Sequence, residues 1–172
     1  SLTVKWKFNV ADKITAGPVV ENNTLYIGAE SGVFYALDTE TGKERWQFKT
    51  RGYIMAKATI HNDIVFFESS SVFYALDKNT GKELWKYDLG WPVWGYKIDH
   101  WDDIHSSAVV HNDVFYVGTS LGAVLGLNAS DGTPVLVLPK GLRAPIRSTP
   151  VIHNNKIYFG DWNGRVYCHS LA

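Results

Sequence analysis

Short apolar runs separated by polar turns follow one another along the whole chain. A typical run has about five positions in which β-branched and aromatic residues alternate or stand together, as in Val33-Phe-Tyr-Ala-Leu-Asp38, and it is bounded by Asn, Asp or Gly. No window has the 3.6-residue period of an amphipathic helix. The pattern therefore predicts an all-β fold built from hairpins.

This hairpin pattern repeats along the chain. The segment 17–28 recurs at 57–68, 107–118 and 149–160. The shared asparagines are Asn22, Asn62, Asn112 and Asn154, at spacings of 40, 50 and 42 residues. Each unit continues into a second pair of runs, so that it has four short strands, which is typical of a β-propeller blade.

The sequence thus predicts one domain, a small β-propeller of four four-stranded antiparallel blades. The expected blades span approximately 14–49, 54–88, 105–138, and 146–172 together with 2–8. The fourth unit lacks a Trp-containing strand, and the N-terminal Val4-Lys-Trp6-Lys-Phe8 matches Trp46-Gln-Phe48. We expect this N-terminal strand to close the last blade, which would protect a sheet edge. A slice of a longer propeller, cut inside one blade, would give the same pattern.

Two units contain a longer shared motif. Ala36-Leu-Asp-Thr-Glu-Thr-Gly-Lys-Glu-Arg-Trp46 recurs at 75–85, while the third copy, 126–136, keeps the glycine and has Leu136 in place of the tryptophan. The motif resembles the tryptophan-docking motif of PQQ-like repeat propellers, the quinoprotein alcohol-dehydrogenase-like family. The resemblance covers essentially the whole chain and implies the propeller fold and an extracellular or periplasmic location. It implies no single activity, because the family includes quinone-dependent dehydrogenases, outer-membrane assembly lipoproteins, stress-sensor domains and accessory modules of polysaccharide enzymes.

Several residues recur at fixed repeat positions, which favours structural roles for them. The tryptophans at one outer-strand position are expected to pack against the neighbouring blade; they are Trp6, Trp46 and Trp85. The histidines of one turn are expected at solvated hairpin tips rather than in a metal site; they are His61, His111 and His153. Cys168 takes the place of Ala36 and Ala75, so we expect it to be small, apolar and buried.

The connection between the second and third units is the longest and the most aromatic. It contains Trp91, Trp94, Tyr96 and Trp101. As an outer-to-inner strand connection it should share a face with the turn that contains Trp162, giving an exposed aromatic patch at the channel mouth. Such a patch suits stacking on a sugar or planar ligand, or anchoring a protein partner. Alternatively, the insertion folds back and plugs its own ring.

Residues at the start of the inner strands should line the central channel. The repeat aligns Thr15, Met55, His105 and Arg147 at one position, and Gly17, Lys57, Ser107 and Thr149 two residues later. Lys57, His105 and Arg147 without a matching acid would favour an anion such as a carboxylate or phosphate. In the alternative, Glu68 or Asp161 pairs with these cations, or water fills the channel.

Other candidate chemistry in the sequence is weak. The acidic and histidine cluster at 99–105 matches no established metal-ligand signature. Ser107 lies near His105 without an acid to orient the imidazole, which argues against a catalytic triad. No catalytic residue and no metal ligand is therefore assigned.

Composition excludes several classes of function. The chain has 17 Lys and Arg against 17 Asp and Glu and no basic run, which argues against nucleic acid. No apolar run reaches the roughly 18 residues of a membrane-spanning helix. The single cysteine allows no intramolecular disulfide. Because the chain starts at Ser1, we expect it to be processed or cut from something longer.

We therefore interpret the chain as a non-catalytic binding module without a cofactor, which presents an aromatic-rich loop face to a protein or glycan. The expected site residues are Lys57, Trp91, Trp94, Trp101, His105, Arg147 and Trp162. Two alternatives are a relative or fragment of a dehydrogenase that uses pyrroloquinoline quinone with Ca²⁺, and an accessory domain of a polysaccharide-active enzyme. Only Lys57 and Arg147 fit the quinone enzyme. The oligomeric state is not predicted.

Overall fold

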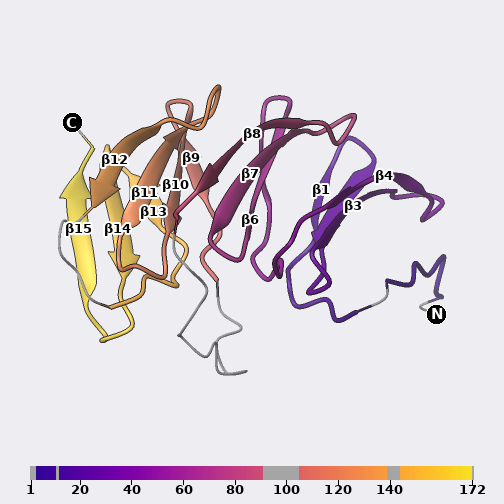
Figure 1. The fold of residues 1–172 in the computed structure, drawn as a ribbon, viewed down its shortest axis with the longest axis horizontal. Coiled ribbons are helices and arrows are strands. Elements are labelled where there is room, and N and C mark those ends of the chain that lie inside the picture. Colours follow the sequence, from indigo (N-terminus) through magenta and orange to yellow (C-terminus); the bar gives the residue numbers. More distant parts are fainter. Residues whose placement is uncertain (1–2, 11, 91–104, 139–143, 172) are drawn as a thin grey trace.

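The computed structural model describes residues 3–10, 12–90, 105–138 and 144–171. Every regular element in these ranges is a β-strand. The strands form four antiparallel sheets, one for each repeat unit, which stand side by side in chain order (Figure 1). No helix in the described ranges could span a membrane.

The first three sheets each have four strands in chain order. They are β1 (Val19–Glu21), β2 (Thr24–Gly28), β3 (Val33–Asp38) and β4 (Glu44–Lys49) in blade one; β5 (Thr59–His61), β6 (Ile64–Ser69), β7 (Val72–Asp77) and β8 (Glu83–Asp88) in blade two; and β9 (Val109–His111), β10 (Val114–Gly118), β11 (Val124–Asn128) and β12 (Pro134–Leu138) in blade three. Blade four has β13 (Val151–His153), β14 (Lys156–Gly160) and β15 (Val166–Ser170). The propeller-like all-β fold is thereby confirmed.

The local sequence explains why each hairpin turns where it does. Asn22 and Asn23 have φ angles of 46° and 59°, the left-handed conformation that a tight two-residue hairpin turn needs and that asparagine tolerates. At the same end of the blade, in the turn from β3 to β4, Asp38 accepts hydrogen bonds from the N–H groups of Glu40 and Thr41, and Gly42 then takes a φ of 70°. The Asn pair and the Asp-to-Gly turn thus end the strands on either side of them and fix the strand lengths.

The hydrophobic core lies between neighbouring blades and is organised by stacked aromatic rings. Phe34 of blade one stacks on Phe67 of blade two with ring centroids 4.1 Å apart, and Phe66 stacks on Phe115 of blade three at 4.4 Å. Because residues alternate between the two faces of a strand, Phe66 and Phe67 reach opposite neighbours. The sheet of blade two therefore buries both faces.

The repeated tryptophans bind one blade to the next, as predicted. The Trp46 indole N–H donates to the carbonyl oxygen of Lys78 in blade two (3.1 Å), and its ring lies over Gly81. Trp85 makes the same bond to Ala129 in blade three (2.8 Å) and lies over a glycine of that blade. Each outer strand is thus fastened to the turn of the following blade.

The N-terminal segment does not complete the last blade in this structure. Residues 3–10 form no strand, and the fourth sheet has three described strands. Trp6 instead donates its indole N–H to Thr39 of blade one (2.8 Å), and Phe8 contacts Tyr35 edge-on with centroids 5.4 Å apart. The two ends of the chain lie at opposite ends of the row of sheets (Figure 1). Trp6 thus docks on blade one as Trp46 docks on blade two, but the described residues place no strand at the outer edge of β15, so the predicted closure is not seen.

The missing outer strand also changes the surroundings of Cys168. Ala36 and Ala75 are fully buried because Trp46 and Trp85 lie opposite them on the outer strands. Cys168 has the equivalent place on β15 but is exposed, since the described part of the chain places no outer strand beside it. The prediction of a buried cysteine was wrong.

The hairpin-tip histidines are less solvated than predicted in one case. His61 Nε2 lies 2.7 Å from Asp113 Oδ1, a residue of the equivalent turn in blade three. Its side chain is 24% exposed, so the tip of blade two contacts the tip of blade three. The described residues contain no group of three His, Cys, Asp or Glu side chains that could hold a metal ion.

Candidate functional site: the loop face and the inner cleft

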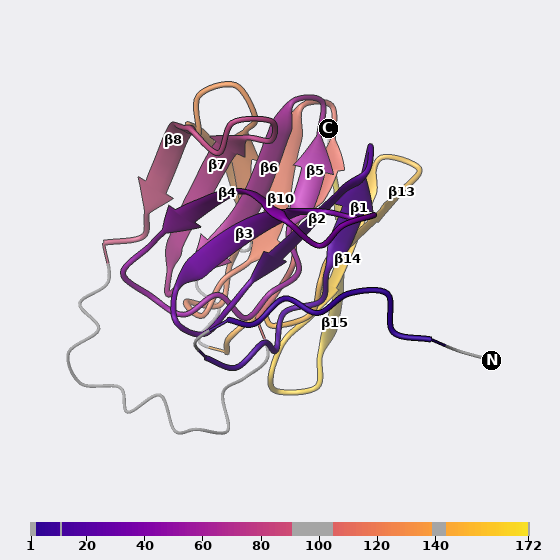
Figure 2. The ribbon, with the colours of Figure 1, turned by 90° about the vertical axis from the view of Figure 1, so that its right-hand side faces the viewer.

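The four blades place their inner strands on one side of the molecule. Seen along the row of blades, β1, β5 and β13 lie on one side, and the outer strands β4 and β8 lie on the other (Figure 2). A connecting segment precedes each inner strand. The last residues of each segment therefore lie near the equivalent residues of the other blades. The predicted channel residues lie in these segments.

A cleft of about 430 Å³ lies along the inner strands. Its lining residues come from all four blades and are Val19, Val20, Glu21, Lys57, Ala58, Thr59, Ile60, Ser107, Ala108 and Thr149. Three predicted channel positions, Lys57, Ser107 and Thr149, therefore meet in one place. The Ser107 N–H donates to Thr149 Oγ1 (3.1 Å), which joins blade three to blade four at the cleft.

Charge in the cleft comes from two residues of opposite sign. The Lys57 side chain is exposed and extends beside Gly17, where an added Cβ would lie 3.8 Å from the lysine Cβ. Glu21 is bound to Lys78 Nζ at 2.6 Å. Because an ion pair already neutralises Glu21, Lys57 supplies the positive charge of the cleft.

His105 pairs with Glu68, one of the two acids that the sequence suggested as alternative partners for the channel cations. Its Nδ1 lies 3.0 Å from Glu68 Oε2, and the two side chains are only 21% and 11% exposed. The other carboxylate oxygen of Glu68 accepts the N–H of Ser71 (3.0 Å), which fixes the carboxylate at the turn after β6. His105 is thus part of a partly buried pair that joins blades two and three, and the pairing with Glu68 is confirmed.

Arg147 and Trp162 form a cation–π pair at the other end of the row. The guanidinium carbon of Arg147 lies 5.2 Å from the centroid of the indole ring, within the distance at which the ring attracts a cation. The backbone N–H of Trp162 donates to the carbonyl oxygen of Pro145 (2.9 Å), and this bond joins the turn to the segment before β13. Trp162 is nevertheless 57% exposed. The beginning of its turn is held by Asp161, whose carboxylate accepts the Tyr167 hydroxyl at 2.9 Å.

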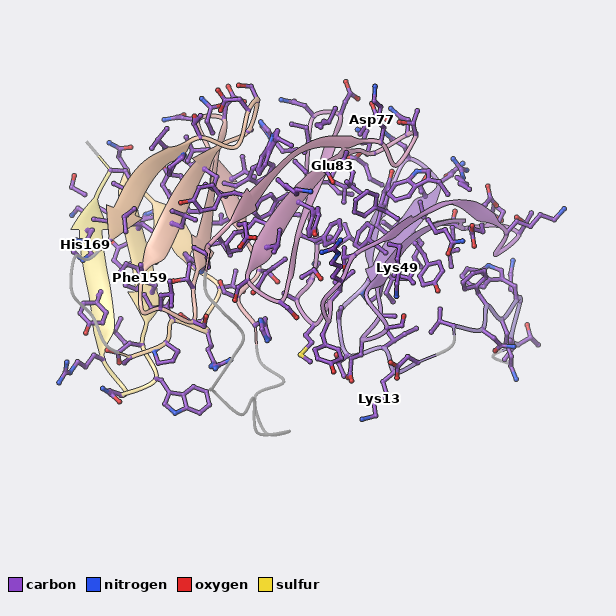
Figure 3. The ribbon with its side chains drawn as sticks, viewed as in Figure 1. Lys13, Lys49, Asp77, Glu83, Phe159 and His169 are labelled. Carbon is purple, nitrogen blue, oxygen red and sulfur yellow. The ribbon has the colours of Figure 1, made fainter. Side chains whose placement is uncertain are left out.

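The turns between second and third strands share one face with the segments that precede the inner strands, and we call this surface the loop face. Its described parts are 12–18, 29–32, 50–58, 70–71, 105–108, 119–123, 144–150 and 161–165. Backbone hydrogen bonds join the two sets within blades one, two and four, from Glu30 to Lys13, Ser70 to Tyr53 and Trp162 to Pro145. A further bond, from Ile146 to Thr119, joins blade four to blade three. Lys13 marks this face and Asp77 the opposite one (Figure 3).

Exposed apolar side chains gather on the loop face. Tyr53 is 52% exposed and Leu121 is 37% exposed, in addition to Trp162. Sequence reasoning had selected Trp162 but missed Tyr53 and Leu121. Their signal was weak, because Leu121 is a single apolar residue in a glycine-containing turn and Tyr53 begins a short apolar run, Tyr53-Ile-Met-Ala56, that does not alternate. Trp91, Trp94, Tyr96 and Trp101, and the cluster at 99–104, lie outside the described residues.

Comparison with known proteins shows one family across the chain. A family model described as "Outer membrane protein assembly factor BamB" matches residues 3–172. The outer membrane protein assembly factor BamB of Shewanella oneidensis is 28% identical over 175 residues, an alignment that covers 95% of this chain and 42% of that protein.

Solved structures show the same fold in larger proteins. The crystal structure of BamB from Moraxella catarrhalis matches with a TM-score of 0.81 and 26% identity, over 97% of this chain and 49% of that one. The quinohemoprotein alcohol dehydrogenase of Comamonas testosteroni matches with a TM-score of 0.68 at 17% identity, over 87% of this chain and 29% of that one. The chain therefore spans about half the length of the BamB proteins that it matches or less.

Proposed function

We propose that this chain binds other proteins. It belongs to the family whose model is described as "Outer membrane protein assembly factor BamB". Two relatives bear the name of an outer membrane assembly factor, and this favours protein partners and a periplasmic location. The chain spans 42% of the Shewanella protein, so these properties are proposed for this part of the fold.

The observation that carries the proposal is the exposed Trp162 beneath the Arg147 guanidinium. Tryptophan and arginine are the residue types most often found at the energetic centres of protein interfaces. The cation–π contact holds both side chains in place before a partner arrives, so less side-chain entropy is lost on binding. Tyr53 and Leu121 extend the apolar surface of the same face.

The inner cleft adds a cation beside this apolar surface. Lys57 stands in the segment 50–58 of the loop face and lines the cleft with the hydroxyl-bearing Ser107 and Thr149. A carboxylate of the partner would find one positive charge and hydrogen-bonding groups there. We therefore include Lys57 in the proposed binding site, together with Arg147 and Trp162, while His105 orients the neighbouring loop through Glu68.

A glycan partner is the second candidate, and the same tryptophan supports it. An exposed indole can stack on a sugar ring, as the aromatic loop-face hypothesis requires. The aliphatic Leu121 on the described face favours a protein instead, because an aliphatic side chain offers no flat platform. We propose the protein partner for this reason.

The residues that the structure describes do not fit a quinone site of the dehydrogenase type. Such a site would need a Ca²⁺-binding group of acidic side chains and a carboxylate base. The described part of the cleft contributes Glu21 alone, and this carboxylate is bound to Lys78.

Binding to purified outer membrane assembly machinery from Shewanella oneidensis, followed by biolayer interferometry, tests the proposal. Trp162→Ala should weaken binding at least about tenfold, the loss typical of a central interface residue. The matched control is Leu84→Ala, because Leu84 is 49% exposed on the outer strand β8, away from the loop face. Binding that survives both Trp162→Ala and Tyr53→Ala would contradict the proposal, and binding on an oligosaccharide array alone would favour the glycan.

A further inference from the structure

The outer strand of blade three has no charged side chain, unlike the outer strands of blades one and two. β12 reads Pro134-Val-Leu-Val-Leu138, while β4 contains Glu44, Arg45 and Lys49. β8 contains a glutamate, a lysine and an aspartate. The three strands have the same place in their blades, since each is the fourth strand of its sheet and pairs with the third. The difference therefore belongs to the side chains and not to the fold.

The two central valines of β12 are exposed. Leu136 has the register position of Trp46, so Val135 and Val137, on either side of it, replace a charged and an amide side chain of β4. Leu136 and Leu138 pack on the core cluster between blades three and four. Because neighbours along a strand point to opposite faces, the valines point away from that core, and they are 53% and 48% exposed.

The backbone of β12 is also open on its outer side. Within the described ranges, β12 pairs with β11 alone and ends its sheet (Figure 1). Alternate residues of an antiparallel edge strand turn both N–H and C=O away from their sheet, and these groups can pair with a further strand. Natural proteins protect such edges with charged side chains, lysine above all. Lys86 of β8, 3.6 Å from Glu83, fits this protective role, and β12 has no equivalent charge.

Two prolines limit the length of the open edge. Pro134 begins β12, and Pro139 follows its last residue in the sequence. Proline has no N–H group to donate to a neighbouring strand. The stretch that can pair fully is therefore 135–138, the length of a short strand. This edge suits one short added segment and not the growth of a long sheet.

The open edge continues into the loop face. Leu138 pairs with Val124, which directly follows the loop-face turn 119–123. In that turn Leu121 is 37% exposed. An extended segment beside β12 therefore has one end next to the surface for which a protein partner is proposed.

We infer that the partner of the loop face adds a short extended segment to the outer edge of β12, with uncharged side chains and an apolar residue at every second position. Backbone hydrogen bonds hold the segment, and its apolar side chains cover Val135 and Val137. A charged side chain there loses water without meeting an opposite charge, because β12 offers none. The inference rests on the proposed function, since it names the form in which part of that partner binds.

The probe for the edge is a synthetic peptide of about seven residues in which valine and threonine alternate, with blocked ends and a fluorophore. Its binding to the 172-residue chain is measured by fluorescence anisotropy. Val137→Lys places a charge on the edge and should weaken binding at least about tenfold. The matched control is Gln47→Lys, at the equivalent exposed position of β4, which should leave the dissociation constant unchanged. Both side chains are exposed, so circular dichroism should show an intact fold for both variants.

Hydrogen exchange locates the added segment independently of affinity. With saturating peptide, outward-facing amides within 135–138 should exchange at least about tenfold more slowly, while those of β4 and β8 stay unchanged. A peptide with proline at its centre should give no protection, because it cannot complete the strand pairing. Protection of a different strand, or no binding of the wild-type chain at about 1 mM peptide, would overturn the inference.

A second measurement separates this inference from the proposed function. On the outer membrane assembly machinery of Shewanella oneidensis, Val137→Lys and Trp162→Ala should each weaken binding. A loss with Trp162→Ala alone would support the loop face as the binding site and overturn strand addition at β12. A loss with Val137→Lys alone would support strand addition and contradict the role proposed for the loop face.

Discussion

Trp46 and Lys78 join the first two blades through one hydrogen bond, from the indole N–H to a carbonyl oxygen 3.1 Å away. Burial of the ring and the hydrogen bond both contribute to stability, and they can be separated by substitution. Trp46→Ala should lower the free energy of unfolding by about 3 to 5 kcal/mol, as for other large-to-small core changes. Trp46→Phe keeps most of the apolar contact and should cost about 1 to 3 kcal/mol for the lost bond.

Urea denaturation followed by circular dichroism measures both effects. The exposed Trp162→Ala serves as the control and should change stability by less than about 0.5 kcal/mol. Equal losses for Trp46→Ala and Trp162→Ala would show that Trp162 is a packing residue of the blade, against the interpretation given above.

Substitution of Gly81 tests whether contact with the Trp46 ring or the positive φ of the backbone contributes more to the loss of stability at this turn. Its φ is 73°, and an added Cβ would lie 2.6 Å from the Trp46 ring, so Gly81→Ala suffers from both strain and a clash. Gly164 has a φ of 77° with nothing within 4 Å of the added Cβ, so Gly164→Ala suffers from strain alone. We expect about 1 to 2 kcal/mol for Gly164→Ala and a clearly larger loss for Gly81→Ala. Thermal unfolding of the two variants gives the comparison, and equal losses would argue against a rigid tryptophan.

The turn carboxylates should make the fold sensitive to acid. The Arg45 guanidinium, with a nitrogen 2.7 Å from Asp38, and the hydrogen bonds from Thr41 hold the pKa of Asp38 well below its ordinary value of 3.8. The Thr80 hydroxyl in the same way lowers the pKa of Asp77. Because both groups bind protons more weakly in the folded state, their contribution is complete above about pH 4 and is lost as the pH falls through the lowered values.

Urea midpoints measured between pH 6 and pH 2 should therefore decline on the acid side. Asp77→Asn removes one of these carboxylates, so the variant should be less stable at pH 6 and should lose less on acidification. A wild-type midpoint that stays constant down to pH 2 would contradict the assignment of these two carboxylates.

Thr50 and Ser69 form a buried polar contact where the loop face meets blade two. Their hydroxyl oxygens lie 2.7 Å apart, and Thr50 Oγ1 also donates to the Gly32 carbonyl at 2.9 Å. Thr50→Val keeps the shape and leaves the Ser69 hydroxyl with one partner fewer, so we expect a loss of about 1 to 3 kcal/mol. The double variant Thr50→Val with Ser69→Ala should recover part of it. Strictly additive losses in chemical denaturation would mean that the two hydroxyls do not interact.

Features that repeat were predictable from the sequence. The Asn turn pairs, the docking tryptophans and the four-stranded blades each appear several times, so their position in the repeat revealed their role. Cys168 was wrongly expected to be buried because its equivalents Ala36 and Ala75 are covered by an outer strand, and the described residues of blade four include no such strand. Trp6 docks on blade one as the repeat implies, but whether residues 4–8 also pair with β15 depends on three-dimensional packing, which the repeat alone does not determine.

The candidate site was harder to predict because its residues occur once each. Lys57 was placed correctly at the inner cleft, since the repeat aligned the starts of the inner strands. Whether Glu68 or another group would pair with His105 depends on the exact course of two turns from different blades. Tyr53 and Leu121 were missed because neither lies in an alternating run whose period would mark the exposed side chain.

The one-way docking of each indole on the turn that follows has an evolutionary consequence. A whole unit can be duplicated or deleted without inventing a new contact, because every copy brings both the ring that is inserted and the glycine that receives it. Gene duplication of a single forty-residue module is then enough to lengthen or shorten the array, and the number of units becomes a quantity that selection can change in whole steps.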